Sequence, residues 1–426
     1  MKIKNFHDLA VTKEREAALM IAETGLDVID TRKAMAQNVR REGDVLIVQG
    51  RVVPLGNVER VIVVGAGKCA YDAAAVLEEV LGDRLTGGVV ASICDDKLKK
   101  LATFCGTHPY PTPVNIEATN AIMKALSGLT ERDLVLAVIS GGGSTLLCQP
   151  DRLTCENEAD ILRALFRKGA TIEEINILRK HLSRARGGFL AQYAYPAEVI
   201  TLIFSDVPGN DIRHVASGPT ILDHTTVEDA RAVLEKYGIE RELGIEIPLI
   251  ETPKEEKYFT RVWNTTVVSN ELALNAMAEK ARELGFTPDV RTSDLTGEAR
   301  EVAKRIVGEL HAAPAHSVLL YGGETTVTIT KPGKGGRGLE GVLAACGEIE
   351  TGELFMSIAS DGRDNTDFAG ALCDIMTKEK ARQFGLDIGW HLENNASYRF
   401  FELVQDYLMT GNTGSNVSDL IVAVKL

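Results

Sequence analysis

The sequence lacks the features that mark several large classes of protein. No uninterrupted apolar run reaches the roughly 18 residues that a membrane-spanning helix needs. Residues 1–30 intersperse charges among apolar residues, so they lack the continuous apolar core of a signal peptide. The seven cysteines are odd in number, scattered and without a C-x-x-C pair, which favours reduced thiols and offers no zinc site. We therefore expect a soluble, cytoplasmic protein.

An excess of basic residues is also missing. The chain has 60 acidic and 47 basic residues and a net charge of -13. Because a phosphate backbone requires a basic face, this balance argues against a nucleic-acid partner. It does not argue against a small anion, since one local basic cleft is enough to bind it. We expect a small-molecule substrate and no nucleic-acid or membrane partner, and we leave open whether the protein forms a homodimer.

Short apolar runs alternate with helical segments along the chain. Residues 61–67 and 87–93 read as strands, 134–144 as a strand followed by a glycine turn, and 198–209 as a strand followed by a loop. Residues 117–129 and 173–192 read as helical stretches between them. Near-continuous apolar strands separated by helices indicate a parallel sheet that is covered on both faces. After a charged stretch at 223–258, a second set mixes helical crossovers with a hairpin, so we expect a mixed sheet there. Its strands are expected within 264–270, 316–330, 354–362 and 419–426.

A glycine-rich turn follows the first of these strands, in VIVVGAGKCAYDAA (61–74). Gly65, Gly67 and Ala70 match G-x-G-x-x-A, the spacing that places a dinucleotide pyrophosphate on a helix N-terminus. Lys68, however, lies inside the turn. A dehydrogenase would also place an acidic residue about 20 positions on, whereas Asp95 and Asp96 follow about 30 positions after Gly65. The turn fits a nicotinamide site poorly and leaves open a lysine held in an anion-binding cleft.

A second glycine turn, SGGGS, follows the strand at 134–140. Its consecutive glycines permit positive φ and leave amide N–H groups free to converge on an anion. The spacing of a Walker A loop is absent. We take the whole turn as a candidate phosphate-binding element, with the residues Ser140, Gly141, Gly142, Gly143 and Ser144.

Carboxylates and one arginine follow three further strands. Asp206 in SDVPGND could hold Mg²⁺, accept a proton or cap the following turn. Glu324 follows a strand, and Arg337 lies in a glycine-rich basic loop, where its guanidinium could bind a carboxylate or phosphate with two hydrogen bonds. Asp361 belongs to SDGRDNTD, which lacks the register of an EF-hand and could coordinate magnesium beside phosphates.

Two histidines lack a nucleophile at a motif spacing. His108 lies in GTHPYPTP, and His181 lies in the basic segment RKHLSRARGG. Packing or hydrogen bonding is the favoured interpretation of each, although the basic segment 179–186 could present positive charge to an anionic substrate. Taken together, a lysine, an amide-rich turn, carboxylates and a loop arginine favour phosphoryl transfer over hydride transfer, because phosphoryl transfer requires many anion-binding groups.

The ordered blocks VVGAGKCA, GTHPYPTP, AVISGGGSTL, LRKHLSRARGG, SDVPGND, GGETTVTI and SDGRDNTD resemble the class II glycerate kinases, which carry a MOFRL domain. The resemblance runs from about residue 8 to about residue 425. It implies a Rossmann-like, mostly parallel three-layer glycerate kinase domain over residues 1–250. It also implies a smaller MOFRL-type α/β domain with a mixed sheet over residues 251–426, and an active site in the cleft between the two domains.

The activity implied by this resemblance is the ATP- and Mg²⁺-dependent phosphorylation of D-glycerate at its 2-hydroxyl. Lys68 and Arg337 match the residues that the family ties to catalysis. We expect residues 140–144 to hold ATP phosphates, and Asp206, Asp361 or Glu324 to assist Mg²⁺. Asp206 is our first choice for the group that accepts the hydroxyl proton.

The chain departs from the family pattern in two blocks. The family loop GGRNQE reads GGRGLE here, with Gly338 and Leu339, and the block DGTDGPTDAAGA has Arg363 and Asn365 in place of a threonine and a glycine. We expect both changes to lie at the substrate end of the site, which leaves the acceptor acid open. The alternatives are the kinase of a related sugar acid, an NAD(P)H-dependent hydroxypyruvate reductase, and a non-catalytic nucleotide- or sugar-acid-binding regulator.

Overall fold

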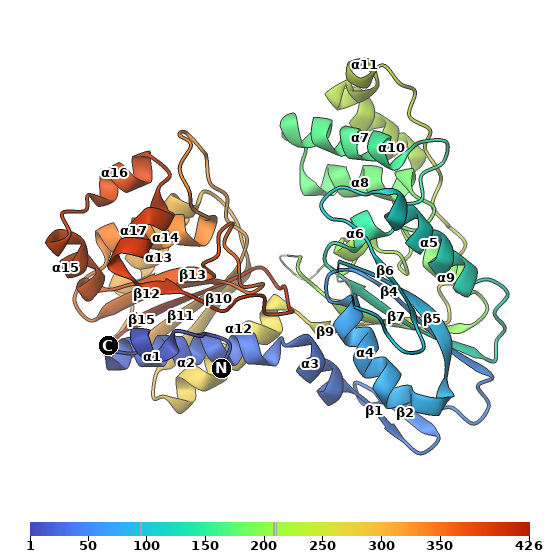
Figure 1. The fold of residues 1–426 in the computed structure, drawn as a ribbon, viewed down its shortest axis with the longest axis horizontal. Helices are drawn as coiled ribbons and strands as arrows, with labels where there is room; N and C mark the ends of the chain where they lie inside the picture. Colours follow the sequence, from blue (N-terminus) through green and yellow to red (C-terminus); the bar gives the residue numbers. More distant parts are fainter. Residues whose placement is uncertain (94–95, 208, 210) are drawn as a thin grey trace. The chain divides into compact units, whose positions relative to one another are not determined.

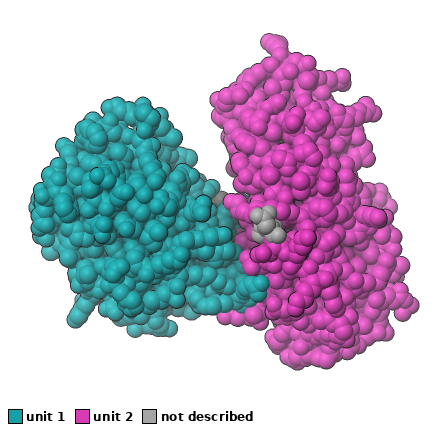
Figure 2. Space-filling view, in the orientation of Figure 1, with its two compact units in different colours: residues 1–33, 206–210, 268–426 teal, residues 34–205, 211–267 magenta. Residues whose placement is uncertain are grey.

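The computed structural model describes residues 1–426 except 94, 95, 208 and 210. The chain divides into two compact units, each with its own sheet and helices (Figure 1). Unit 1 comprises residues 1–33, 206–210 and 268–426, and unit 2 comprises residues 34–205 and 211–267 (Figure 2). The predicted α/β class is confirmed in both units.

Unit 2 is built on a six-stranded sheet in the order β6-β5-β4-β7-β8-β9. The pairs from β6 through β8 are all parallel, as predicted. β7 is buried along its whole length, because helices and loops cover both of its faces. The strands are β4 (Arg60–Ala66), β5 (Leu85–Ser92), β6 (Ala102–Cys105), β7 (Asp133–Ser140), β8 (Glu198–Phe204) and β9 (Val262–Val268). A separate antiparallel sheet contains β1 (Val39–Glu42), β2 (Val45–Val48) and β3 (Arg51–Pro54).

The strand order of this sheet reverses between β4 and β7. From β4 the chain runs outward through β5 and β6, then returns to the other side of β4 and runs outward through β7 and β8. In an open parallel sheet, ligands bind beyond the carboxyl ends of the strands at such a switch point. The turns that begin at residues 67 and 141 follow these two strands.

Helices pack along the sheet and in a separate layer of unit 2. α4 (Ala70–Leu81) and α5 (Pro113–Ala125) contact β5, and α9 (Phe189–Ala194) contacts β8. The charged stretch 223–258 contains two helices that share an apolar core with α7 and α8. The bounds of these four helices are α7 (Cys155–Arg167), α8 (Ile172–Leu182), α10 (Val227–Tyr237) and α11 (Ile239–Leu243).

The single helix predicted over 173–192 is wrong. α8 ends at Leu182, the chain turns, and α9 begins at Phe189. Ser183 is extended, at φ -135° and ψ 133°, which ends α8, and the positive φ of Gly187 and Gly188, at 56° and 92°, keeps the chain non-helical up to the start of α9.

Unit 1 contains a mixed sheet, as predicted, in the order β10-β11-β15-β12-β13-β14. The strand expected within 264–270 is β9, however, and it belongs to the sheet of unit 2. Only β10 and β11 pair in parallel, and the other neighbours are antiparallel. Its strands are β10 (Thr287–Leu295), β11 (Ser317–Gly323), β12 (Glu353–Ala359), β13 (Gly370–Cys373), β14 (Tyr407–Leu408) and β15 (Asp419–Lys425). Its principal helices are α2 (Lys13–Val28), α12 (Asn270–Glu283), α13 (Ala299–Ala312), α14 (Arg337–Glu348), α15 (Ile375–Gln383), α16 (Ile388–Glu393) and α17 (Ser397–Val404).

The compact units do not coincide with a single division at residue 250. At the amino terminus, α2 packs against α12, and the buried Arg15 bonds Asp374 (Nε–Oδ2 2.6 Å) and Asp406 (Nη1–Oδ1 2.7 Å). These contacts attach residues 1–33 to unit 1. Residues 251–267 belong to unit 2, because β9 extends its sheet beside β8.

No helix among the described residues is both long enough and apolar enough to span a bilayer.

Candidate functional site

The two glycine turns of unit 2 are bonded to each other at the switch point. The amide of Lys68 donates to the carbonyl of Gly141 (2.9 Å), and the amide of Cys69 donates to Ser140 Oγ (3.1 Å). Gly67 has a φ of 136°, and a Cβ there would overlap Ser140 Oγ. Only glycine therefore allows the turn after β4 to lie this close to the turn after β7.

The SGGGS turn presents backbone amides rather than hydroxyls. The amides of residues 141–144 have no hydrogen-bond acceptor among the residues that the structure describes. Ser140 Oγ is occupied by the Cys69 amide, and Ser144 Oγ lies 2.9 Å from Ser217 Oγ. The predicted phosphate-binding turn thus has free N–H donors, whereas the two serine hydroxyls contact protein groups.

Lys68 and His108 both contact the middle of this turn. A Cβ on Gly142, whose φ is 80°, would lie 3.2 Å from Lys68 Cγ and 3.2 Å from His108 Cδ2. Although His108 as a residue remains exposed, desolvation of its ring and the positive charges of Lys68 and Arg179 lower its pKa to about 4. His108 is therefore uncharged at neutral pH, and this part of the site takes its positive charge from the lysine and the arginine.

The basic segment 179–186 is mostly neutralised by acidic partners. The buried His181 bonds the Ile250 carbonyl through Nδ1 (2.8 Å), in agreement with the hydrogen-bonding interpretation. The other pairs are Lys180 with Asp223 (2.9 Å), Arg184 with Asp151 (3.2 Å) and Arg186 with Glu158 (2.6 Å). Arg179 is different, because its side chain makes no ion pair or hydrogen bond with any of the described residues, which are all but 94, 95, 208 and 210. Desolvation, followed by the charge of Arg186, lowers the pKa of Arg179 to about 10.

Arg337 begins α14 in unit 1 and binds two carboxylates. Its Nε lies 2.6 Å from Asp419 Oδ2, its Nη2 lies 3.2 Å from Asp419 Oδ1, and its Nη1 lies 2.6 Å from Glu324 Oε1. Burial alone would lower the pKa of Arg337, but the charge of Asp419 raises it above its ordinary value. Burial raises the pKa of Asp419 to about 7, against the opposing effect of Arg337. The arginine is fixed in place and already paired.

The first turn of α14 is capped by a residue that the sequence analysis did not select. Asp364 accepts hydrogen bonds from the amides of Gly338 (3.1 Å) and Leu339 (2.6 Å), and burial raises its pKa. The Leu339 side chain is fully buried in the core of unit 1. Our expectation that the change at Leu339 lies at the substrate end is therefore wrong, because the helical register turns this side chain into the core.

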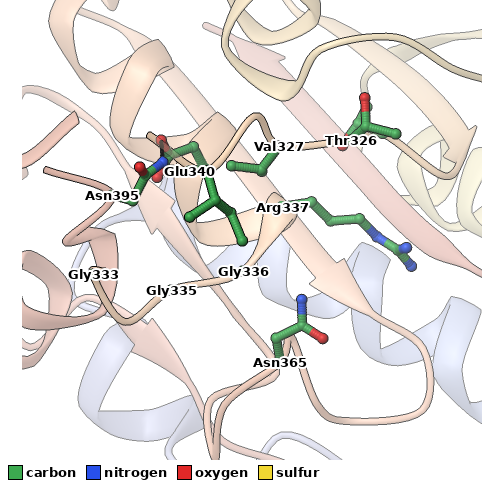
Figure 3. A pocket seen from close by; sticks show the side chains of 11 residues that line it. Thr326, Val327, Gly333, Gly335, Gly336, Arg337, Glu340, Asn365 and Asn395 are labelled. Carbon is green, nitrogen blue, oxygen red and sulfur yellow. Dashed lines mark hydrogen bonds between the residues drawn. The ribbon is translucent and has the colours of Figure 1, made fainter. Parts of the chain in front are cut away.

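A pocket of about 300 Å³ lies beside Arg337, within unit 1 (Figure 3). It is formed by residues 325–329, by the KPGKGG loop with the start of α14, and by two asparagines, one of them Asn365, a position where this chain departs from the family. The lining residues are Thr325, Thr326, Val327, Ile329, Gly333, Gly335, Gly336, Arg337, Glu340, Asn365 and Asn395. Arg363 is exposed and does not line this pocket.

The predicted metal-binding carboxylates, Asp206 and Asp361, both belong to unit 1. Asp206 is held beside the start of β15, where its carbonyl accepts from Ser418 Oγ (2.8 Å) and its Oδ2 from Asn416 Nδ2 (3.4 Å). Asp361 Oδ1 accepts from the Arg363 amide (3.0 Å). Within the described part of the chain, neither belongs to a group of three ligand side chains within 4.8 Å. Such a group, at His311, Glu350 and Glu353, is found elsewhere in the described part of unit 1.

Asp419 and Asp364 were not recognised from the sequence, and Arg179 was not distinguished there from the other basic residues of the segment 179–186. Asp419 opens β15, and because β15 is antiparallel to β11, its first residue is paired with Gly323, next to Glu324. A strand that begins with an acidic residue was a visible signal, but only the antiparallel register connects it to Arg337. Asp95, considered as a ribose-binding residue, lies outside the described residues.

Comparison with known proteins agrees with this arrangement. Residues 17–248 match the model of a domain of unknown function (DUF4147), and residues 317–419 match the MOFRL family. The chain is 35% identical over 387 residues to the D-glycerate 2-kinase of Thermotoga maritima, covering 87% of this chain and 92% of that protein. The chain belongs to the MOFRL-containing glycerate 2-kinase family.

A solved structure and a second relative extend the comparison. The crystal structure of a glycerate kinase from Thermotoga maritima superimposes with a TM-score of 0.84 at 32% identity, covering 96% of this chain and 99% of that one. A relative from Agrobacterium vitis, provisionally named a hydroxypyruvate reductase, is 36% identical over 379 residues, covering 85% of this chain and 86% of that protein. The fold prediction is confirmed by the solved structure of this glycerate 2-kinase family relative.

Proposed function

We propose that this protein is an ATP- and Mg²⁺-dependent kinase that phosphorylates the 2-hydroxyl of D-glycerate and releases 2-phosphoglycerate. Similarity over most of the chain to a D-glycerate 2-kinase supports the activity. The observation that carries the proposal for the site is the position of Lys68: a lysine without an acidic partner among the described residues lies against a turn with free amides at the switch point of a parallel sheet.

The amides of residues 141–144 are the proposed binding site for ATP phosphates. Converging N–H groups in a glycine turn form a concavity that suits phosphate oxygens. Gly65 and Gly67 act indirectly, because they allow the turn after β4 to approach β5 and Ser140. Ser140 is proposed to hold this turn through its hydroxyl, and Ser144 to contribute its amide.

In the proposed reaction, the 2-hydroxyl oxygen of D-glycerate attacks the γ-phosphorus of ATP. The new O–P bond forms as the bond to the β-phosphate oxygen breaks, and ADP leaves. The hydroxyl proton passes to a carboxylate, for which Asp206 remains the first choice. Lys68 and Arg337 stabilise the negative charge on the transferring group, which is the main task of protein side chains in phosphoryl transfer.

The carboxylates of unit 1 fit a magnesium ion that is bound mainly through phosphates and water. Mg²⁺ in nucleotide sites uses one or two protein carboxylates, so a preformed cluster of three is not required. We propose Asp206 and Asp361 for this role, since Glu324 is already paired with Arg337. When bound with ATP, the ion supplies positive charge that neutralises the β- and γ-phosphates.

The proposed reaction needs residues of both compact units. Lys68 and residues 141–144 belong to unit 2, whereas Arg337, Asp206 and Asp361 belong to unit 1. We propose that both sets act on the same pair of substrates, with the glycerate kinase domain over 1–250 and the MOFRL-type domain over 251–426 as the functional division and the active site in the cleft between them. A homodimer and a cytoplasmic location stay predictions.

The first test is to incubate the purified protein with ATP, Mg²⁺ and D-glycerate and to follow ADP and the phosphoglycerate isomer by NMR. We expect glycerate-dependent ADP and 2-phosphoglycerate. Formation of 3-phosphoglycerate would contradict the assigned hydroxyl, and activity only with other hydroxy acids would indicate the kinase of a related sugar acid. Oxidation of NADH by hydroxypyruvate, without kinase activity, would favour the reductase that one relative's name suggests.

A further inference from the structure

The substrate of a hydroxy-acid kinase carries a carboxylate, and Arg337 is poorly suited to bind it. One guanidinium faces two carboxylates there, Asp419 with two hydrogen bonds and Glu324 with one ion pair. Asp419 occupies the Nε–Nη2 edge of the guanidinium, so this edge is not free to hold a substrate carboxylate with two hydrogen bonds. The substrate carboxylate therefore requires another cation.

α8 presents a suitable cation toward the SGGGS turn. Asn176 Oδ1 accepts from Ser217 Oγ (3.0 Å), which lies 2.9 Å from Ser144 Oγ. This chain of hydrogen bonds turns the Asn176 face of α8 toward the end of β7. Arg179 is three positions further along, and residues three apart lie on the same face of a helix. Arg179 therefore lies on the face of α8 that looks toward the turn.

Arg179 is half-buried and has no ion-pair partner among the described residues, since Glu158, the carboxylate whose charge acts on it, is bonded to Arg186. The other basic residues of the segment 180–186 each have an acidic or carbonyl partner. A desolvated charge without a partner lowers the stability of the fold, since burial disfavours the charged form. Such a residue is expected where a ligand supplies the missing charge.

Lys68 is the second unpaired cation of this region. Its aliphatic chain contacts Gly142, where the His108 ring also lies. Desolvation and the charges of Lys68 and Arg179 lower the pKa of His108, so its imidazole is neutral. Neither Lys68 nor Arg179 forms an ion pair with a described residue. An anion that enters this region gains from both cations.

We propose that Arg179 binds the carboxylate of the hydroxy-acid substrate, with Lys68 between this carboxylate and the transferring phosphoryl group. The inference rests on the proposed kinase function and assigns its acid-recognition site. A planar guanidinium can hold a carboxylate with two parallel hydrogen bonds, which a lysine cannot do. Arg337 is then left to act on the phosphoryl oxygens, one of the two roles considered for it.

The test compares Arg179→Ala and Arg179→Lys with Arg184→Ala, whose surface ion pair with Asp151 makes it a matched control. We expect Arg179→Ala to raise the KM for D-glycerate on the order of 10- to 100-fold, the usual effect of losing hydrogen bonds to a charged group. The KM for ATP should change little, Arg179→Lys should recover only part of the loss, and Arg184→Ala should behave as wild type.

An uncharged acceptor substrate shows whether Arg179 binds the carboxylate of the substrate or the phosphates of ATP. With D-glyceramide, which lacks the carboxylate, wild type and Arg179→Ala should have similar kcat/KM, because the lost interaction does not exist for this acceptor. An equal loss with both acceptors, or a rise in the KM for ATP, would assign Arg179 to the nucleotide and overturn the inference. In the absence of substrate, Arg179→Ala should also have a higher Tm than wild type, since an unpaired charge is removed; a lower Tm would indicate a structural role.

The two proposals fail in different ways. Wild-type protein that neither phosphorylates nor binds D-glycerate by calorimetry would overturn the proposed function and this inference with it. Active wild type with an unchanged KM for D-glycerate in Arg179→Ala would overturn the inference alone.

Discussion

Both oxygens of Asp419 accept hydrogen bonds from Arg337, at 2.6 Å from Nε and 3.2 Å from Nη2. The pair fixes the guanidinium at the first residue of α14, beside the pocket that Asn365 and the glycine-rich segment also line. A group that neutralises charge in a transition state must be held in position before the reaction, and this carboxylate supplies the restraint.

We therefore expect Asp419→Asn to impair catalysis although Asp419 is not proposed to touch the substrate. The amide keeps the shape but loses the charge and one strong acceptor, so Arg337 is held less firmly. A misplacement of about 1 Å costs on the order of 10² in rate, and we expect kcat to fall by about this factor. The check is the steady-state kinetics of Asp419→Asn, of Arg337→Ala and of the variant that combines both substitutions. Full kcat in Asp419→Asn would contradict the positioning role. A combined variant with a much lower kcat than Arg337→Ala alone would also contradict it.

Lys68 is expected to act on the transition state and to matter little for folding. It has no ion pair or side-chain hydrogen bond with the described residues, so Lys68→Ala should leave the Tm nearly unchanged. Loss of one charged donor aimed at a transition state costs about 10²–10³ in kcat. Lys236→Ala, which removes a surface lysine paired with Glu174, is the control and should retain full activity. A kcat close to wild type in Lys68→Ala would remove the lysine from the mechanism.

The combination of Lys68→Ala with Arg337→Ala tests whether the two compact units serve one reaction. Residues that stabilise the same transition state are strongly non-additive, so the double variant should be little worse than the poorer single one. The measurement is kcat for wild type, the two single variants and the double variant, which together form a double-mutant cycle. Simple multiplication of the two single losses would indicate that the residues act independently and not as one unit.

The sequence predicted those features of the site that depend on local signals. A near-continuous apolar run followed by glycines predicted both β4 and β7 with their turns, since burial on both faces and positive φ are properties of consecutive residues. Because parallel strands bring their carboxyl ends to one edge, the meeting of Lys68 with the SGGGS turn followed from the fold class alone.

Features that depend on long-range register could not be predicted. Arg337 and Asp419 are 82 positions apart and meet only because β15 enters the sheet antiparallel to β11. Leu339 was read as part of a loop, whereas α14 begins at Arg337 and turns that side chain into the core. The attachment of residues 1–33 to unit 1 depends on the pairing of Arg15 with acids more than 300 positions away, and no local pattern indicates it.

The strand that ends at the SGGGS turn begins with an ion pair whose effect depends on pH. Hydrogen bonds from Arg60, at 2.8 Å and 2.6 Å, lower the pKa of the buried Asp133 to about 2. A carboxyl whose pKa is lower in the folded state stabilises the fold above its ordinary pKa of about 4 and loses this contribution as the pH falls toward 2. Urea unfolding between pH 2 and pH 6 should give a flatter profile for Asp133→Asn than for wild type. Asp160→Asn, which breaks an exposed pair with Arg163, should keep the wild-type slope, and identical slopes for all three proteins would contradict the assignment.

Gly142 and Gly128 offer a matched pair for testing the phosphate-binding turn. Both have positive φ, at 80° and 68°, so alanine strains the backbone at each position by about 1–2 kcal/mol. At Gly128 a Cβ meets nothing within 4 Å, whereas at Gly142 it lies 3.2 Å from both Lys68 Cγ and His108 Cδ2. We expect both variants to lose similar stability in urea, but only Gly142→Ala to show a raised KM for ATP and a lower kcat, because the methyl group displaces Lys68 and disturbs the free amides. If Gly128→Ala lost as much activity as Gly142→Ala, the effect would come from general destabilisation, and the turn would have no specific part in binding ATP.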